Sequence, residues 1–321
     1  MKKRIIVMVL LAGSFLFAVN AAAQTAERTY HTVQNGRIKL EAMLVVPAGG
    51  AAAKAAVVFV GGSGASNVLD YAAGFTDRLI ESIYLPRDIA VFYLNKRGTG
   101  KSMGNWKFGS IEQQAYDLLA AVRYLRDLPV IDADRVGIAG HSQGGWVVQL
   151  AGSLDPRVAF VVSMAGPSVM VREHDLKRVE IQLHCEGVEG EELNKKVEKR
   201  DRAHNIMIFV GKWFPFFELR LMSNILPFDP APALKTLTQP VLLAFAELDS
   251  MVPPDQNLGR LNEIFPNGLP SNMTQFTTPK ADHLFHITDT ICFDYEASLA
   301  KPYSEEYRRF LAAWIDENVA D

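Results

Sequence analysis

The chain has 321 residues, of which 49% are hydrophobic and 21% are charged, and its formal net charge is −3. This composition suits one large globular domain, or a domain with an insert, and it excludes an intrinsically disordered chain. A net charge so close to zero gives no electrostatic basis for nucleic-acid binding, and we expect no nucleic-acid partner.

The first 23 residues have the layout of a secretory signal peptide. Lys2, Lys3 and Arg4 precede an apolar run over 5–19, and the small residues 21–23 offer a cleavage site. A transmembrane anchor is the alternative, but an apolar helix of this length extends only about 22 Å against a hydrocarbon core of about 30 Å. We therefore expect a periplasmic or extracellular protein with no membrane span after cleavage.

The chain contains two cysteines, Cys185 and Cys292. Two are too few for a disulfide scaffold, and no ligand spacing typical of a metal site is present, so no metal is expected. The two could pair in an oxidising compartment. Nothing in their spacing favours a bridge, and two unpaired thiols are the favoured expectation.

Strand and helix patterns alternate along the mature chain. Two strand-like runs over 28–47 flank Asn35-Gly36, a pair that favours a hairpin turn. Buried strands are then predicted at 55–60, 89–95, 135–140, 158–166, 240–249 and 272–278, and helices at 111–126, 143–154 and 305–319. This alternation predicts an α/β protein with a mostly parallel sheet and helices on both faces.

The stretch NKRGTGKSMG, residues 95–104, is similar to the end of a phosphate-binding loop. The pattern G-x-x-x-x-G-K-[ST] needs a glycine where this chain has Asn95, and it needs a helix after Ser102, where a glycine-containing loop follows. We therefore interpret the stretch as a structural loop and expect no organic cofactor.

The interval 167–238 breaks the alternation. Its one candidate strand is the apolar run 206–210, while 172–204 is rich in both signs of charge and 213–227 in Phe and Leu. A connection of this length is usually functional or a small domain of its own. We interpret it as a mainly helical insert.

The sequence Gly140-His141-Ser142-Gln143-Gly144 lies between a predicted buried strand and a predicted helix. The G-x-S-x-G pattern in this context is typical of a nucleophile elbow, a tight turn that exposes a serine hydroxyl above the edge of a sheet. A serine with only a turn role is the alternative. Ser142 is thus the candidate nucleophile.

A serine nucleophile needs a histidine base and an acid that orients it. Beyond an elbow of this kind the acid should come before the histidine in the chain. Asp249 follows the strand at 240–249 and is the favoured acid, with Glu247 as the alternative. His283 is the favoured base over His286, and His141 is expected to pack or to line a pocket.

With these residues in place, the chain resembles the α/β-hydrolase superfamily, and more closely its serine esterases and peptidase-like hydrolases. The resemblance is carried by VVFVGGSG, YLNKRGTGKSMG, GHSQGG, AELDSMVPP and ADHLF, which follow the order of the family over roughly 55–290. It implies a hydrolase core over 24–166 and 239–321, with 167–238 as a cap above the nucleophile.

The resemblance also implies roles for several residues. The backbone N–H groups of Gln143 and Ser63 would form the oxyanion hole, with Gly62 or Gly64 as alternatives to Ser63. Arg97 would brace the loop at 95–104. From the cap, Trp213 and Phe217 would contribute to an apolar acyl site.

The expected function is that of an exported serine hydrolase that cleaves small-molecule carboxylic esters through an acyl-enzyme. Ser142 would attack, His283 would transfer the proton and Asp249 would orient the imidazole. A peptidase, amidase or thioesterase with the same triad is the alternative within enzymes. A hydrolase-fold protein that only binds is the alternative outside them.

Overall fold

The computed structural model describes residues 26–47, 53, 55–65, 67–71, 74–213 and 217–319. The predicted signal peptide at 1–23 lies outside these residues. Of the helices within the described ranges, none has the length and apolar character needed to cross a membrane.

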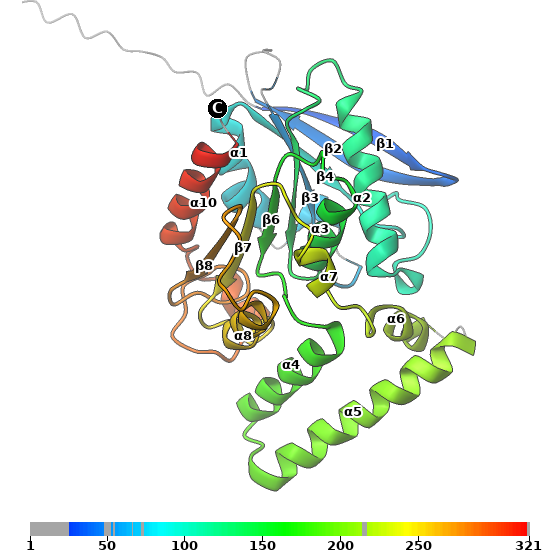
Figure 1. Ribbon diagram of the computed structural model, residues 1–321, viewed down its shortest axis with the longest axis vertical. Coiled ribbons are helices and arrows are strands. Elements are labelled where there is room, and N and C mark those ends of the chain that lie inside the picture. The colour runs from blue at the N-terminus through cyan, green and yellow to red at the C-terminus, as the bar shows by residue number, and fades with distance from the viewer. Residues whose placement is uncertain are drawn as a thin grey trace, which may run out of the picture.

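The described strands form one eight-stranded sheet in the order β1-β2-β4-β3-β5-β6-β7-β8 (Figure 1). The strands are β1 (Glu27–Asn35), β2 (Ile38–Val46), β3 (Ala55–Val60), β4 (Ile89–Leu94), β5 (Val136–His141), β6 (Val161–Met164), β7 (Val241–Ala246) and β8 (Met273–Thr278). β1 and β2 form the predicted antiparallel hairpin, and β2 also runs antiparallel to β4. The other pairs are parallel, which confirms the predicted fold class.

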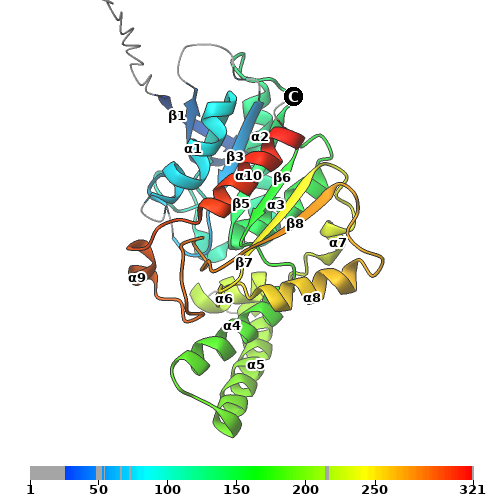
Figure 2. The ribbon, with the colours of Figure 1, turned by 90° about the vertical axis from the view of Figure 1, so that its left-hand side faces the viewer.

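Helices cover both faces of this sheet (Figures 1 and 2). The helices outside the interval 167–238 are α1 (Ser82–Tyr84), α2 (Ile111–Arg126), α3 (Gln143–Leu154), α8 (Pro254–Ile264), α9 (Tyr295–Leu299) and α10 (Glu305–Asn318). Because successive strand residues point to opposite faces, Ile138 packs in the core beneath α2 and α3, whereas Ala139 packs in the core beneath α10. The central strands β3, β4, β5, β6 and β7 are therefore mostly apolar along their length, whereas β8 at the edge of the sheet is more polar.

The interval 167–238 folds into four helices between β6 and β7, which are α4 (Val171–Cys185), α5 (Gly190–Trp213), α6 (Phe217–Ile225) and α7 (Ala231–Leu234). We call residues 167–238 the helical insert. The strand candidate at 206–210 is wrong, because this run belongs to α5. A short apolar run cannot be assigned from periodicity alone, and here it continues a helix that begins at Gly190. α4 and α5 extend away from the sheet in both views (Figures 1 and 2).

Charged groups hold α4 against α5. The carboxylate of Asp175 accepts hydrogen bonds from Arg178 at 2.9 Å, from Arg200 at 2.7 Å and from His204 at 2.8 Å. Burial raises the pKa of Asp175, but the hydrogen bonds from Arg200 and Arg178 outweigh it and hold that pKa well below the usual range. The two helices are thus joined by an ionised, fully hydrogen-bonded carboxylate.

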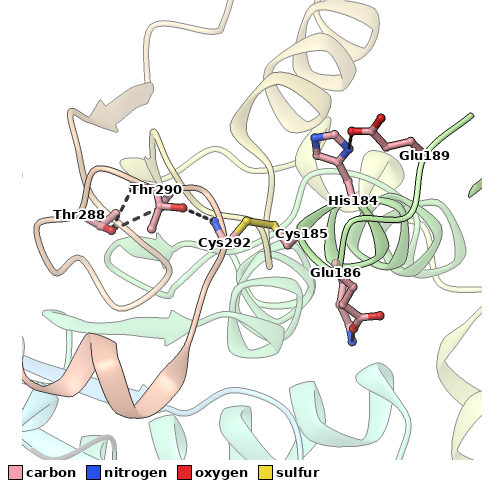
Figure 3. Close-up of a disulfide and its surroundings, with 8 residues drawn as sticks. His184, Cys185, Glu186, Glu189, Thr288, Thr290 and Cys292 are labelled. Carbon is pink, nitrogen blue, oxygen red and sulfur yellow. Dashed lines mark hydrogen bonds and ion pairs between the residues drawn. A yellow bond between two sulfur atoms is a disulfide. The ribbon is translucent and has the colours of Figure 1, made fainter.

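A disulfide joins Cys185, at the end of α4, to Cys292, in the segment between β8 and α9 (Figure 3). The expectation of two unpaired thiols is therefore wrong. The topology brings the two cysteines together across 107 residues, and no local pattern in the sequence reveals this proximity. The bond ties the helical insert to the segment that follows His283.

Removal of this disulfide should destabilise the protein. A cross-link that closes a loop of about 100 residues lowers the entropy of the unfolded chain, and native disulfides usually contribute about 2–5 kcal/mol. We expect Cys185→Ala, Cys292→Ala and the double variant to lower the free energy of urea unfolding by a similar amount. A reducing agent should lower the free energy of unfolding of the wild type to that of the double variant, and it should leave the double variant unchanged. Equal unfolding midpoints for wild type and double variant would contradict the prediction.

Candidate active site

Ser142 occupies the turn between β5 and α3, with φ 56° and ψ −122°. A residue with a side chain in such a conformation costs about 1–3 kcal/mol and persists only where its surroundings fix it. Here the Ser142 N–H donates to the Met164 carbonyl at 2.9 Å, and the Gly145 N–H donates to the Ser142 carbonyl at 2.8 Å. This is the sharp turn that the sequence predicts.

Two glycines of the motif leave room for this turn. A Cβ atom on Gly140 would lie 2.2 Å from the Gly144 carbonyl oxygen, and one on Gly144 would lie 2.7 Å from the Val60 carbonyl oxygen. Both separations are far below van der Waals contact with backbone atoms that cannot move aside. The glycines are therefore required by the close approach of α3 to the strands.

Asp249 and His283 meet beyond the ends of β7 and β8. Asp249 Oδ2 accepts a hydrogen bond from His283 Nδ1 at 2.8 Å, and the carboxylate is fully buried. Its Oδ1 accepts the backbone N–H groups of Met251 at 2.7 Å and Val252 at 2.8 Å, which fixes its orientation. With its proton on Nδ1, the His283 ring keeps Nε2 free of a proton and able to act as a base.

The alternative acid and base lie elsewhere. Glu247 is exposed, and its Oε2 accepts the Lys280 N–H at 2.7 Å. His286 Nδ1 contacts Ser298 Oγ at 2.9 Å, and Ser298 donates to Asp282 at 2.6 Å, so His286 belongs to a separate buried cluster. The structure thus brings the favoured pair together and not the alternatives.

Ser142 and His283 line one cavity of about 380 Å³, which we call the histidine-side cavity. Its lining residues are Gly62, Ser63, Asn67, Tyr71, His141, Ser142, Met251, His283, Leu284, Phe293 and Tyr295. Between these two described residues no hydrogen bond joins the Ser142 hydroxyl to the His283 ring. In substrate-free sites this contact is often long and shortens when substrate binds.

Ser142 also borders a second cavity of about 370 Å³, which we call the insert-side cavity. Helical-insert residues that line it are Val171, His174, Asp175 and Arg178 of α4 and Leu221, Met222 and Ile225 of α6. From the rest of the chain it is lined by Ser63, Gly64, Lys96, Arg97, Trp106, Gly109, Gln113, Gln114, Ser142, Gln143, Trp146 and Met251. The nucleophile candidate therefore lies between two cavities.

Trp213, one of the two residues named for an acyl site, is not found in the lining of either cavity. Trp213 is 75% exposed at the end of α5, and the side chain of Phe217 lies outside the described part of the chain. The apolar residues of the helical insert that line the insert-side cavity are Val171 of α4 and Leu221, Met222 and Ile225 of α6. The spacing of the α6 residues on one helical face was a usable signal in the sequence, but the sequence alone does not show which face of α6 points inward.

A chain of hydrogen bonds connects the turn after β3 to the histidine segment. The Gly62 N–H donates to Tyr71 Oη at 2.8 Å, Tyr71 Oη contacts His141 Nδ1 at 2.7 Å, and His141 Nε2 contacts the His283 carbonyl at 2.9 Å. Because a carbonyl only accepts, His141 carries its proton on Nε2 and accepts the Tyr71 O–H at Nδ1. Burial keeps the pKa of His141 well below the usual imidazole range, and the ring is neutral.

His141 thus positions the backbone of His283 and does more than fill space beside the nucleophile. The sequence gives a histidine in the elbow motif but no signal for its partner, since Tyr71 lies in a loop without a motif. Sequence reasoning therefore missed this connection.

The loop at 95–104 is anchored to the site from several directions. Arg97 forms a bidentate pair with Asp117 at 2.7 and 2.8 Å, which confirms its bracing role. Asn95 accepts the Val68 N–H at 2.7 Å. The Lys96 ammonium donates to the Gly62 carbonyl.

The sheet order, the turn at Ser142 and the position of the site beyond the parallel strands define an α/β-hydrolase fold. Solved structures share this fold at low sequence identity. The Pyrococcus furiosus esterase Pf2001 matches with a TM-score of 0.61 and 18% identity over 92% of each chain. DcsB, solved with its substrate analogue, matches with a TM-score of 0.61 and 20% identity over 92% of this chain and 100% of that chain. Dienelactone hydrolase from Anabaena variabilis matches with a TM-score of 0.55 and 18% identity over 92% of this chain and 99% of that chain.

Residues 77–317, well over half of the sequence, match the prolyl oligopeptidase family. The chain belongs to this family and is a serine hydrolase. No curated protein matches it at a significant level.

Proposed function

We propose that the protein hydrolyses carboxylic esters of small molecules through an acyl-enzyme formed on Ser142. The observation that carries this proposal is that Ser142 and His283 line one cavity, while Asp249 binds the His283 ring from behind it. Nucleophilic catalysis by serine needs a base oriented by an acid, and these three residues have the chemistry for it.

In the proposed reaction, the Ser142 hydroxyl attacks the ester carbonyl while His283 Nε2 accepts its proton. The imidazolium is stabilised by Asp249 and returns the proton to the departing alkoxide. Water then attacks the acyl-enzyme with His283 again as base, and Ser142 is released with the carboxylic acid.

The tetrahedral intermediate needs two N–H donors for its oxyanion. Gln143 is the first residue of α3, and the first N–H groups of a helix have no partner within the helix. In the turn after β3, Ser63 lines both cavities together with Ser142, and this position supports Ser63 as the second donor.

The geometry also supports an assignment of the two substrate halves. His283 must protonate the leaving group, so the leaving group belongs in the histidine-side cavity. The acyl group then enters the insert-side cavity, where α6 gives an apolar wall. Both volumes, about 370 and 380 Å³, fall within the range of small-molecule sites.

A peptidase or amidase is the second candidate, and the family match favours it because the family is named for oligopeptide hydrolysis. The same triad can cleave amides. A panel of ester, thioester and aminoacyl-amide substrates with matched acyl groups decides between them. Turnover of amides that equals or exceeds turnover of esters would replace our proposal with the second candidate.

Substitutions of the proposed triad residues should lower kcat, whereas substitution of a nearby residue outside the triad should not. Ser142→Ala should reduce kcat by up to about a million-fold, and Asp249→Asn by about ten thousand-fold because the imidazole tautomer is no longer held. Glu247→Gln is the matched control and should leave kcat within twofold of wild type, roughly the noise of such assays. Normal turnover by Ser142→Ala, or the reverse ranking of the two acids, would refute the assignment.

The length of the acyl chain should report on the insert-side cavity. Each methylene buried there contributes about 0.8 kcal/mol, or about a fourfold rise in kcat/KM, from acetyl to about hexanoyl esters. Met222→Ala should flatten this trend because it removes part of the α6 wall. Trp213→Ala, on the exposed end of α5, should leave the trend unchanged. If the trend depended on Trp213 and not on Met222, the acyl group would bind near the end of α5, and our assignment to the insert-side cavity would be wrong.

We also propose that the protein is exported, with residues 1–23 removed. The Cys185–Cys292 disulfide supports this proposal because such bonds persist in oxidising compartments. Protein purified from the source cells should begin near Gln24 and fractionate outside the inner membrane. A cytosolic protein that keeps Lys2 and Lys3 would rule the proposal out.

A further inference from the structure

Lys96 lies two residues beyond the end of β4, and its ammonium donates to the carbonyl oxygen of Gly62. The residue borders the insert-side cavity together with Ser63 and Ser142. Among the described residues it has no carboxylate partner. Lys96 is half-buried, and desolvating an ammonium group without a counter-ion is costly, so this arrangement calls for a functional account.

The other charged groups that face this cavity are already paired. Arg97 binds Asp117, and Arg178 binds Asp175. His174 also lines the cavity, and burial lowers its pKa to about 4, so it is neutral near pH 7. Among the described residues that line this cavity, Lys96 is therefore the cation that binds no carboxylate. Its ammonium donates to a backbone carbonyl instead.

The group that Lys96 holds shares a peptide unit with the proposed oxyanion donor. A peptide unit is planar and trans, so the Gly62 carbonyl and the Ser63 N–H point in opposite directions. Fixing the carbonyl with the ammonium therefore fixes the direction of the Ser63 N–H. The N–H of Gly62 itself is fixed by Tyr71, and the peptide units on both sides of Gly62 are held.

Gly62 needs such support because it has no side chain to anchor it. A Cβ atom there would lie 2.7 Å from Tyr71 Oη and 3.1 Å from Ser142 Cβ, so no other residue fits beside the nucleophile. Glycine also has the largest backbone freedom of any residue. The position must therefore be glycine, and its orientation must be set by hydrogen bonds from outside the turn.

We propose that Lys96 is a positioning residue for catalysis, which holds the Gly62 carbonyl and thereby aims the Ser63 N–H at the oxyanion. The charge also polarises the peptide unit, which strengthens the N–H as a donor. This inference rests on the proposed function, because it assumes acyl transfer at Ser142.

The role has a pH signature that a purely structural lysine would not produce. Burial lowers the pKa of Lys96 to about 8. The ammonium is therefore present below that pH and lost above it, and a charge-assisted hydrogen bond is about twice as strong as a neutral one. Arg97 and Arg178 are held by carboxylates, and burial raises the pKa of Tyr71 far above its usual value. We expect kcat to fall as the pH rises through about 8, to a lower plateau and not to zero.

The test measures kcat and KM for a neutral ester and for a succinate half-ester from pH 6 to 10 in wild type, Lys96→Met and Lys101→Met. Lys101 is the matched control, an exposed lysine of the same loop. Lys96→Met should lower kcat about 10- to 100-fold, less than the loss of an oxyanion donor altogether, with little change in KM. The fall in kcat above about pH 8 should be absent in Lys96→Met. Lys101→Met should have the same pH profile of kcat as the wild type.

Three results would overturn the inference. They are an alkaline decline that persists in Lys96→Met, a loss confined to esters that carry a carboxylate, such as a succinate half-ester, and a wild-type profile that stays level to pH 10. The last result is read from wild-type protein and does not require the variant to fold. Failure of the proposed function is distinguishable, because Ser142→Ala would then retain activity.

Discussion

The active-site geometry depends on one constraint, the positive φ that the backbone adopts at Ser142 between β5 and α3. The strain is stabilised by hydrogen bonds on both sides of the residue and by glycines that let α3 approach the sheet. Because the turn cannot relax, the hydroxyl stays at the carboxyl edge of the parallel strands. The segments after β3, β7 and β8 reach that same edge, and each contributes a group to the site.

The precision of the site comes from hydrogen bonds that cross between these segments. Tyr71 and His141 connect the turn after β3 with the backbone of His283, and Lys96 holds the same turn from the loop after β4. The disulfide adds a covalent link between the helical insert and the histidine segment. The segments on the two sides of the site are therefore joined, and a displacement of one segment should displace its neighbours.

The strands, the helices α2, α3 and α10 and the proposed triad could be predicted because each depends on local patterns. The central parallel strands are buried, mostly apolar runs, and Ser142 and Asp249 each follow one. The disulfide, the inward face of α6 and the partners of His141 depend on which distant segments meet, and no local pattern carries that information. The strand candidate at 206–210 failed for the related reason that its helical context begins sixteen residues earlier, at Gly190.

The most direct measurement of the central claim is the site of covalent modification by an active-site phosphonate. The intact protein is treated with a fluorophosphonate, digested, and the modified peptide identified by mass spectrometry. Our account predicts one adduct per chain, on the hydroxyl of Ser142, and no adduct in Ser142→Ala. An adduct on another residue, or equal labelling of Ser142→Ala, would contradict it.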